Sequence, residues 1–491
     1  MATVTGMTAS ATESALALKA NITDMNSALA MKADLSAALL RTNNLSDIGN
    51  AATARANINA AQRSIFDVRD YGAKGDGVNN DATAINSAIS AAVTAGGGTV
   101  YLPHGTYSTG ATLLIYGGSG VVIKGENKGT TIIKPVSGST FDAIMTAAPG
   151  VAGTGGFIQK YSGVENLTID CSLMASTVAG HGNAVHFYGA VFSYIRDLII
   201  LNCPNWAIVL DGDSTNFSTK VEIRNNSIQS CGGGILATYA DESSLLYNSI
   251  DGAKLAVASA QPSFDSPDTV GYPIRIKSGF GFIEGNIIGN GGTYTSPALQ
   301  VESSETMRIA NNRFNQVPYQ AIRCIGDNNI IEGNQIGNAS SVGSVEALRL
   351  GSKNNIVIGN RFDILAGSAH YTYCVYEPSA KGSNIVVGNQ VVAGTSGTIH
   401  MDPGSTLNRV ADNVGYNPVG PITSPTLPAT TIPYTNNYGS NAMVYVAGGT
   451  VTAITVGGTA TGITSGGVRV PSGQTIAITY SSAPTWKWFL D

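Results

Sequence analysis

The chain has 491 residues, a net charge of −5 and only 12% charged residues. This length allows several domains or one large repetitive one, and the negative charge argues against nucleic acid as the main partner. The 59 glycines and the low aromatic content of 7% favour short strands and turns over packed helices. The N-terminus lacks a basic segment followed by an apolar core, and no apolar run is long enough for a bilayer, so we predict neither a signal peptide nor membrane insertion.

The first predicted element is a short helix near the N-terminus, where "ALALKAN" (15–21) recurs as "ALAMKAD" (28–34). Four apolar residues there follow a 4-3-4 spacing, that of a coiled-coil seam: Leu18, Ile22, Met25 and Leu29. The regular seam lasts less than three heptads. It is followed by "NNLSDIGNAATARANI" (43–58).

A second helix is predicted within "FDVRDYGAKGDGVNNDATAINSAISAAVTAGGGTVYLPHGTY", residues 66–107. Asp81 is placed to cap it, and Ile85, Ile89 and Val93 fall on one helical face. A repetitive β-structure needs such a plug over its first open coil.

The central part of the chain repeats an apolar stretch, an asparagine and another apolar residue. The repeated asparagines are Asn226, Asn248, Asn286, Asn312, Asn334, Asn360, Asn389 and Asn413. A period mostly in the twenties without a helical pattern is typical of a β-solenoid. Asparagine tolerates the left-handed bend between short strands, so we expect each to mark a corner of one coil and to bond along the axis.

A second register supports this period, because nine short strands align without gaps. Their second and fourth residues are mostly apolar and should point inward, so the third and fifth should point outward. The expected third-position column is His186, Val209, Leu236, Arg275, Gln300, Arg323, Arg349, Val375 and His400. The expected fifth-position column is Tyr188, Asp211, Thr238, Lys277, Glu302, Ile325, Gly351, Glu377 and Asp402. We take this polar face as the candidate working surface, with an insertion at about 253–271 as a loop beside it.

Five prolines between 418 and 433 indicate a boundary after the last coil. Short predicted strands beyond them favour a small β-sandwich. We therefore predict three parts: 1–62 for attachment and connection, 63–415 for the β-helix, and 416–491 for the sandwich.

Three segments carry a resemblance to a known family. Residues 66–107 closely resemble the start of the pectate-lyase-like, right-handed parallel β-helix of bacteriophage tailspikes; residues 43–58 resemble a connector of phage tail fibres, and "ITYSSAPTWKWFLD" is similar to tailspike ends. The resemblance implies a homotrimer on the virion tail that acts at the host cell surface. We accordingly interpret the C-terminal sandwich as a trimer clamp in preference to a carbohydrate-binding module. It also implies a bacterial surface polysaccharide as ligand and attachment to a phage tail or baseplate protein through the N-terminus. It carries no catalytic motif.

Candidate catalytic residues therefore come from the outward face. Glycoside hydrolysis needs two carboxyl groups flanking the bond. Glu302 lies mid-stack among bases, and Asp241 and Glu242 are expected about two coils away. Asp211 with Asp213, and Glu377 with Asp402, are rival groups. His186 and His400 are read as surface polar residues.

Candidate substrate-binding residues surround Glu302: Arg275, Lys277, Glu305, Arg323, Arg349, Tyr239 and Tyr272. Arginine offers a planar fork to an acidic sugar, although these bases could instead only balance the acids. No cofactor or metal is predicted, and the five scattered cysteines are read as buried free thiols. Hydrolysis of a capsule, O-antigen or exopolysaccharide is the first interpretation. A lyase acting on a uronate polymer and a binding-only adhesin are the alternatives.

Overall fold

The computed structural model describes residues 9–32 and 64–490, except 118–119, 147–158, 176–180, 214–215, 252–260, 264–265, 269–271, 278, 280, 290–295, 303–305, 318, 338–344, 364–370, 379–380, 393, 403–404, 406, 417–419 and 439. The chain forms two compact units, Met1–Arg63 and Ser64–Asp491. In the first, α1 (Ala9–Lys32) is a single helix on which Leu18, Ile22 and Met25 are exposed. The connector-like segment 43–58 lies outside the described residues. None of the described helices is long and apolar enough to cross a membrane.

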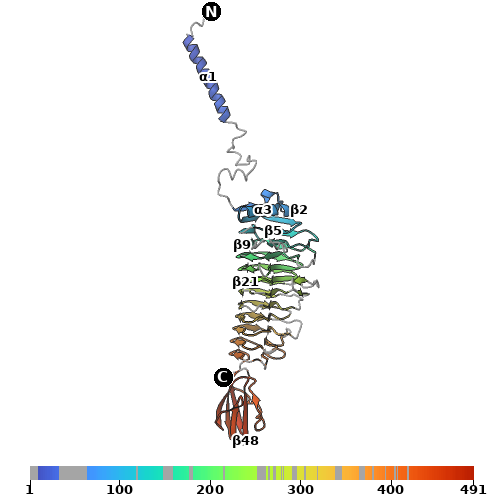
Figure 1. The fold of residues 1–491 in the computed structure, drawn as a ribbon, viewed down its shortest axis with the longest axis vertical. Coiled ribbons are helices and arrows are strands. Elements are labelled where there is room, and N and C mark those ends of the chain that lie inside the picture. The colour runs from blue at the N-terminus through green and yellow to red at the C-terminus, as the bar shows by residue number, and fades with distance from the viewer. Residues whose placement is uncertain are drawn as a thin grey trace. The chain divides into compact units, whose positions relative to one another are not determined.

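The second unit contains a parallel β-solenoid with three long sheets, whose coils are stacked rung above rung in Figure 1. Sheet A has, in spatial order, β1 (Ile65–Asp67), β3 (Gly98–Leu102), β6 (Val121–Gly125), β10 (Gly163–Glu165), β14 (Tyr194–Arg196), β18 (Glu222–Arg224), β22 (Ser244–Leu246), β27 (Phe282–Glu284), β30 (Arg308–Ala310), β33 (Ile330–Glu332), β36 (Ile356–Ile358), β39 (Ile385–Val387) and β41 (Arg409–Ala411).

Sheet B has β2 (Asp76–Asn80), β4 (Gly105–Thr109), β7 (Thr131–Pro135), β11 (Thr168–Asp170), β15 (Ile199–Leu201), β19 (Ser227–Gln229), β23 (Ser249–Asp251), β28 (Ile287–Gly289), β31 (Arg313–Asn315), β34 (Gln335–Gly337) and β37 (Arg361–Asp363). Sheet C has β5 (Leu113–Ile115), β8 (Ile144–Thr146), β12 (Val185–Tyr188), β16 (Trp206–Asp211), β20 (Gly233–Ala237), β26 (Ile274–Ile276), β29 (Leu299–Val301), β32 (Ile322–Cys324), β35 (Leu348–Leu350), β38 (Val375–Tyr376) and β40 (Ile399–His400). A short sheet D contains β9 (Gln159–Lys160), β13 (Ala190–Val191), β17 (Ser218–Thr219) and β21 (Ala240–Asp241). The antiparallel pair β24 (Gln261–Ser263) and β25 (Ser266–Asp268) lies in the predicted insertion.

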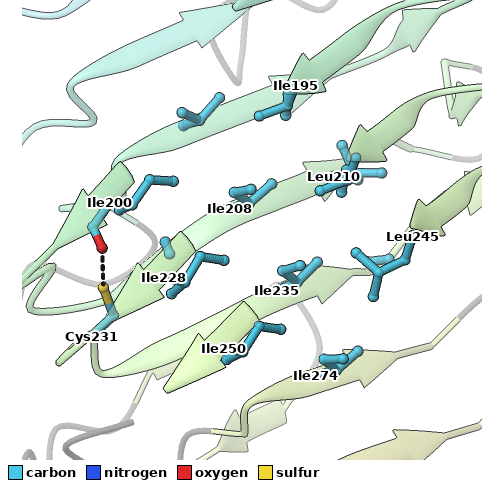
Figure 2. Close-up of a cluster of buried hydrophobic side chains, with 14 of the residues drawn as sticks. Ile195, Ile200, Ile208, Leu210, Ile228, Cys231, Ile235, Leu245, Ile250 and Ile274 are labelled. Carbon is cyan, nitrogen blue, oxygen red and sulfur yellow. Dashed lines mark hydrogen bonds between the residues drawn. The ribbon is translucent and has the colours of Figure 1, made fainter. Parts of the chain in front are cut away.

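The solenoid core consists of aliphatic side chains stacked from coil to coil. Figure 2 shows Ile208, Ile235 and Ile274 on successive strands of sheet C, facing inward beside the row Ile200, Ile228 and Ile250 from sheet B. All six side chains are buried. The alternation of inward apolar and outward residues is therefore the pattern that the sequence predicts.

The repeated asparagines form the predicted ladder at the corner between sheets A and B. From Asn226 to Asn389, each residue donates its backbone N–H and its Nδ2 to Oδ1 of the next asparagine, at 2.8–3.0 Å. The left-handed conformation belongs to the preceding residue, as in Asn225 and Asn311, and not to the ladder asparagines themselves. The corner was predicted correctly, but its bend is made one residue earlier.

A second asparagine ladder, which the repeat analysis missed, lies between sheets C and A. The backbone N–H groups of Asn329, Asn355 and Asn384 each donate to the next asparagine's Oδ1 at 2.9 Å, ending at Asn408. The carboxylate of Glu377 accepts from Nδ2 of Asn384 and Asn408 at the end of this ladder.

The predicted cap helix is α3 (Ala82–Thr94), preceded by the 3-10 turn η2 (Val68–Tyr71), and it buries Ile85 and Ile89 against the first coil. The role predicted for Asp81 is wrong. Its side chain makes no cap bond to the helix and instead accepts from the backbone N–H groups of Lys74 and Gly75. The side chain of Asn80 accepts from the N–H of Ala82 in its place.

The C-terminal part contains two antiparallel four-stranded sheets. One has β42 (Gly420–Pro421), β49 (Thr485–Leu490), β44 (Ala442–Ala447) and β47 (Gly466–Val470); the other has β43 (Tyr434–Thr435), β48 (Thr475–Ser482), β45 (Thr450–Val456) and β46 (Thr459–Ala460). Both contribute to one core around Trp486, Trp488 and Ile476. This arrangement fits the predicted sandwich.

Candidate active site on sheet C

The outer face of sheet C carries the third-position column as a line of side chains on successive coils. The strand pairings align His186, Val209, Leu236, Arg275, Gln300, Arg323 and Arg349 as predicted. The next position is wrong by one residue, because Arg349 pairs with Tyr376 and Val375 pairs with the core residue Leu348. Consequently Val375 and Glu377 are buried, and the rival carboxylate pair of Glu377 with Asp402 is not present on this surface. His400 keeps its predicted place in the column, but its neighbour there is Tyr376 and not Val375.

Glu302 lies directly after β29 at the centre of this face and is held by two donors. Arg275 Nε donates to its Oε1 at 2.6 Å, and Gln300 Nε2 donates to the same oxygen at 2.7 Å. Burial opposes ionisation, but these two hydrogen bonds and the charge of Lys277 outweigh it, so the pKa of Glu302 is lowered. Glu302 is therefore an ionised carboxylate at neutral pH.

The cationic side chains around Glu302 differ in their burial and in their partners. Arg275 is nearly buried, and its guanidinium lies over the ring of Tyr272 at 5.1 Å. Arg349 is paired through Nη1 with Glu346 Oε1 at 2.7 Å and lies over the ring of Tyr376. Burial raises the pKa of Tyr272, with Glu302 adding to the rise and Arg323 opposing it. Glu302, Arg275, Lys277, Arg323 and Tyr272 therefore form one electrostatic cluster.

The other predicted carboxylates lie elsewhere. Asp241 belongs to β21 in sheet D, and Glu242 follows it in a left-handed conformation with φ of 45°. Glu242 is exposed and pairs with Lys220 at 3.1 Å. Tyr239 lies between β20 and β21, and Glu305 is outside the described residues. The structure thus places Asp241 on sheet D and Glu242 directly after it, whereas Glu302 follows a strand of sheet C.

A buried charged cluster near the first coils of sheet C was not recognised from the sequence. His186 is 2% exposed, and the prediction of a surface residue is wrong. Its Nδ1 lies 2.8 Å from Asp142 Oδ2, and its Nε2 lies 3.7 Å from Asp211 Oδ2. His181 Nδ1 approaches the same Asp142 oxygen at 3.5 Å. The sequence could have indicated this cluster, because the coils on either side of His186 each carry an aspartate.

This cluster is ionised. Burial by itself lowers the pKa of His186, but Asp142 and Asp211 outweigh burial and raise it to about 9. Burial would raise the pKa values of Asp142 and Asp211, but their bonds to histidine, Asn183, Thr238 and Gly212 hold both below the usual range. At the loop beyond β16, Tyr188 donates its hydroxyl to Asp213 at 2.7 Å. His186 has both ring nitrogens facing carboxylates, which suits a structural role.

A cluster of three rings lies at the C-terminal end of the third-position column. The rings of Tyr376 and His400 are stacked 5.0 Å apart, and Tyr373 stacks on Tyr376 at 5.3 Å. The faces of these rings are largely occupied by one another. Among the described residues, no group of three His, Cys, Asp or Glu side chains is placed to hold a metal ion.

Comparison with known proteins finds a partial match to a known family. Residues 65–190 match the family described as "Rhamnogalacturonase A/epimerase, pectate lyase-like". The solenoid begins with a segment that is similar to pectate-lyase-like proteins, over the residues that match. It is 42% identical over 113 residues to alginate lyase 7 of Azotobacter vinelandii, covering 21% of this chain and 12% of that protein. The match therefore spans about an eighth of that relative's length.

One solved structure shows the same fold over most of the chain, and a second has a lower similarity. DFA-IIIase of Arthrobacter chlorophenolicus A6 without its lid has a TM-score of 0.52 at 17% identity, covering 74% of this chain and 100% of that one. ORF18 of Geobacillus virus E2 has a TM-score of 0.47 at 16% identity, covering 87% and 78%. The DFA-IIIase likeness shows the solenoid fold alone.

Proposed function

We propose that this protein is a bacteriophage tailspike that binds and depolymerises a polysaccharide on the host surface, with the outer face of sheet C as its working surface. The observation that carries the proposal is the ionised Glu302, held between Arg275 and Gln300 among further cations. The family match to polysaccharide-modifying enzymes supports an enzymatic role. The resemblance of 43–58 and of the C-terminal segment to tail-fibre and tailspike sequences supports the location on a phage tail.

Hydrolysis is the first candidate reaction. An ionised carboxylate suits the nucleophile or the general base, and the second carboxyl group must protonate the leaving oxygen. The lowered pKa of Glu302 suits the ionised role, that of nucleophile or general base, and not that of the proton donor. Asp241 and Glu242 remain the proposed partners, and their position on sheet D requires the sugar chain to cross the edge between sheets C and D.

Elimination is the second candidate, favoured by the cations on this face and by the similarity to alginate lyase 7. A base removes the proton beside a uronate carboxylate, a carbon–carbon double bond forms, and the glycosidic carbon–oxygen bond at the neighbouring carbon breaks. Arg275 and Lys277 would stabilise the negative charge that develops on the carboxylate. Tyr272, with its raised pKa, stays protonated and suits the donor to the leaving oxygen.

We further propose that the chain is a homotrimer that attaches to a tail or baseplate protein through its N-terminus. The support is the apolar spacing of Leu18, Ile22 and Met25, which α1 presents as exposed side chains. Such a seam is buried when helices associate. The C-terminal sheets would act as a clamp for the three chains.

The deciding experiment incubates the protein with purified surface polysaccharides from a panel of bacteria and follows both reducing ends and the ultraviolet absorbance of unsaturated uronates. Reducing ends without absorbance support hydrolysis, and both signals together support elimination. Glu302→Gln should abolish the formation of reducing ends if the reaction is hydrolysis. The matched control is Glu332→Gln, because Glu332 accepts from Arg308 Nε at 2.5 Å in the same manner but on sheet A. Binding without either signal would identify an adhesin and overturn the enzymatic proposal.

A further inference from the structure

The arginines on the outer face of sheet C differ in how their charge is compensated. Arg275 is paired with Glu302, and Arg349 is paired with Glu346. Arg323 lies between them, one coil from Gln300 and one coil from Arg349. Among the residues that the structure describes, Arg323 has no carboxylate within ion-pair distance, and its buried Nε has no hydrogen-bond partner. A guanidinium in this state lacks the anion that its geometry suits.

Two glutamines beside this arginine leave acceptor atoms unused. Gln300 directs its Nε2 to Glu302 and Gln320 directs its Nε2 to Glu346, each at 2.7 Å. These bonds fix the orientation of both amides, and the Oε1 atoms of both are buried without a partner. The two residues are only 5% and 3% exposed. A buried polar atom without a partner is costly, so a ligand that supplies hydroxyl donors would be favoured here.

We infer that Arg323, with Gln300 and Gln320, is the subsite that takes a uronate residue of the polysaccharide. The carboxylate would bind to the two terminal nitrogens of Arg323, in the fork geometry that arginine offers to carboxylates. Binding would have to open access to the two buried Oε1 atoms, to which sugar hydroxyls would then donate. This inference rests on the proposed function for its ligand class and adds that the substrate is acidic.

The neighbouring pairs explain why this position, and not the whole column, selects the anion. Glu302 and Glu346 already neutralise the arginines on either side, and Tyr272 covers the guanidinium of Arg275. A neutral sugar would leave the charge of Arg323 without a partner, whereas a uronate would compensate it. Specificity of this kind comes from the cost of leaving a polar group unpaired.

The test measures binding of the full chain to alginate, polygalacturonate and hyaluronate by affinity electrophoresis at fixed ionic strength, with carboxyl-reduced alginate as the neutral polymer. We expect at least one polyuronate to bind. Arg323→Gln should weaken that binding about 10- to 100-fold, since hydrogen bonds to charged groups contribute about that factor. Binding of the carboxyl-reduced polymer should be weak and unchanged. Arg361→Gln is the control, because Arg361 is paired with Asp363 on sheet B.

Three results would overturn the inference: Arg323→Gln binding every polyuronate like the wild type, no binding of any of the three, or equal Arg323-dependent binding of dextran sulfate, which would indicate a general anion site. The outcome is separable from that of the proposed function. Cleavage of a neutral polysaccharide by the wild type and Arg323→Gln alike would contradict the uronate subsite and support the depolymerase function. Arg323-dependent binding of a polyuronate without any cleavage would support the subsite and contradict the depolymerase function.

Discussion

Replacing Asn334 by alanine should destabilise the solenoid far more than its small change in volume suggests. The Asn334 side chain makes four hydrogen bonds: Oδ1 accepts from the backbone N–H and Nδ2 of Asn312, and Nδ2 donates to Ile309 O and to Asn360 Oδ1. The residue is 0% exposed, so water does not replace these partners. The change therefore interrupts the ladder in its middle.

The magnitude follows from those four bonds. At about 1 kcal/mol for each bond, the loss is about 4 kcal/mol, and the N–H of Asn312 left without an acceptor adds to it. The adjacent Gln335 is the matched control, because its amide is exposed and makes one hydrogen bond at 3.1 Å to Asp363. Gln335→Ala should change the unfolding free energy by less than about 1 kcal/mol.

Urea unfolding followed by far-ultraviolet circular dichroism measures both changes, with the free energy taken from its linear dependence on urea. Limited proteolysis at low urea adds an independent measure, since local opening of the coils exposes cleavable backbone. The reasoning would be refuted by an Asn334→Ala protein whose unfolding free energy lies within about 1 kcal/mol of the wild type and of Gln335→Ala.

Two further predictions concern the buried titratable groups. Because the folded pKa of His186 is about 9, above its ordinary value of 6.5, its stabilising contribution is complete below pH 6.5 and is lost as the pH rises through 9. The melting temperature should fall over that interval, and His186→Gln should flatten the fall; an unchanged slope in the variant would contradict the cluster. Burial raises the pKa of Cys324 to about 12 and of Cys374 to about 11, and all five cysteines are buried and free. Ellman's reagent should therefore react with none of the described thiols in the native protein and with five after denaturation.

Much of the solenoid could be predicted because its rules repeat. The spacing of Asn312, Asn334 and Asn360 reports one corner on every coil, and the strand columns follow from alternation. The second ladder escaped notice because Asn329 and Asn355 each follow an exposed asparagine, so the sequence does not show which member of the pair is buried. The register slip at Val375 arises because three adjacent residues, Cys374, Val375 and Tyr376, can each occupy a strand, and only Tyr376 has aromatic neighbours outside.

The candidate site was predictable in part. Glu302, Arg275 and Tyr272 share a column or adjoin one, so their neighbourhood follows from the coil period. The sequence placed Asp241 near the end of its strand, but it could not show that the chain turns after β20 and forms β21 of sheet D there. The burial of His186 could not be deduced from the alternation, since an outward residue is ordinarily exposed and here lies between two carboxylates.

The asparagine ladder has a consequence for how such a protein can vary. Its bonding rule is the same at every step, so the rung above and the rung below are interchangeable, and a whole coil can be added or removed without altering the chemistry of its neighbours. Positions on the outer face of sheet C are then separated by whole multiples of one strand spacing, about 4.8 Å. The solenoid therefore presents side chains at regular intervals along its axis, and a substitution on one coil changes one position of that series without moving the others.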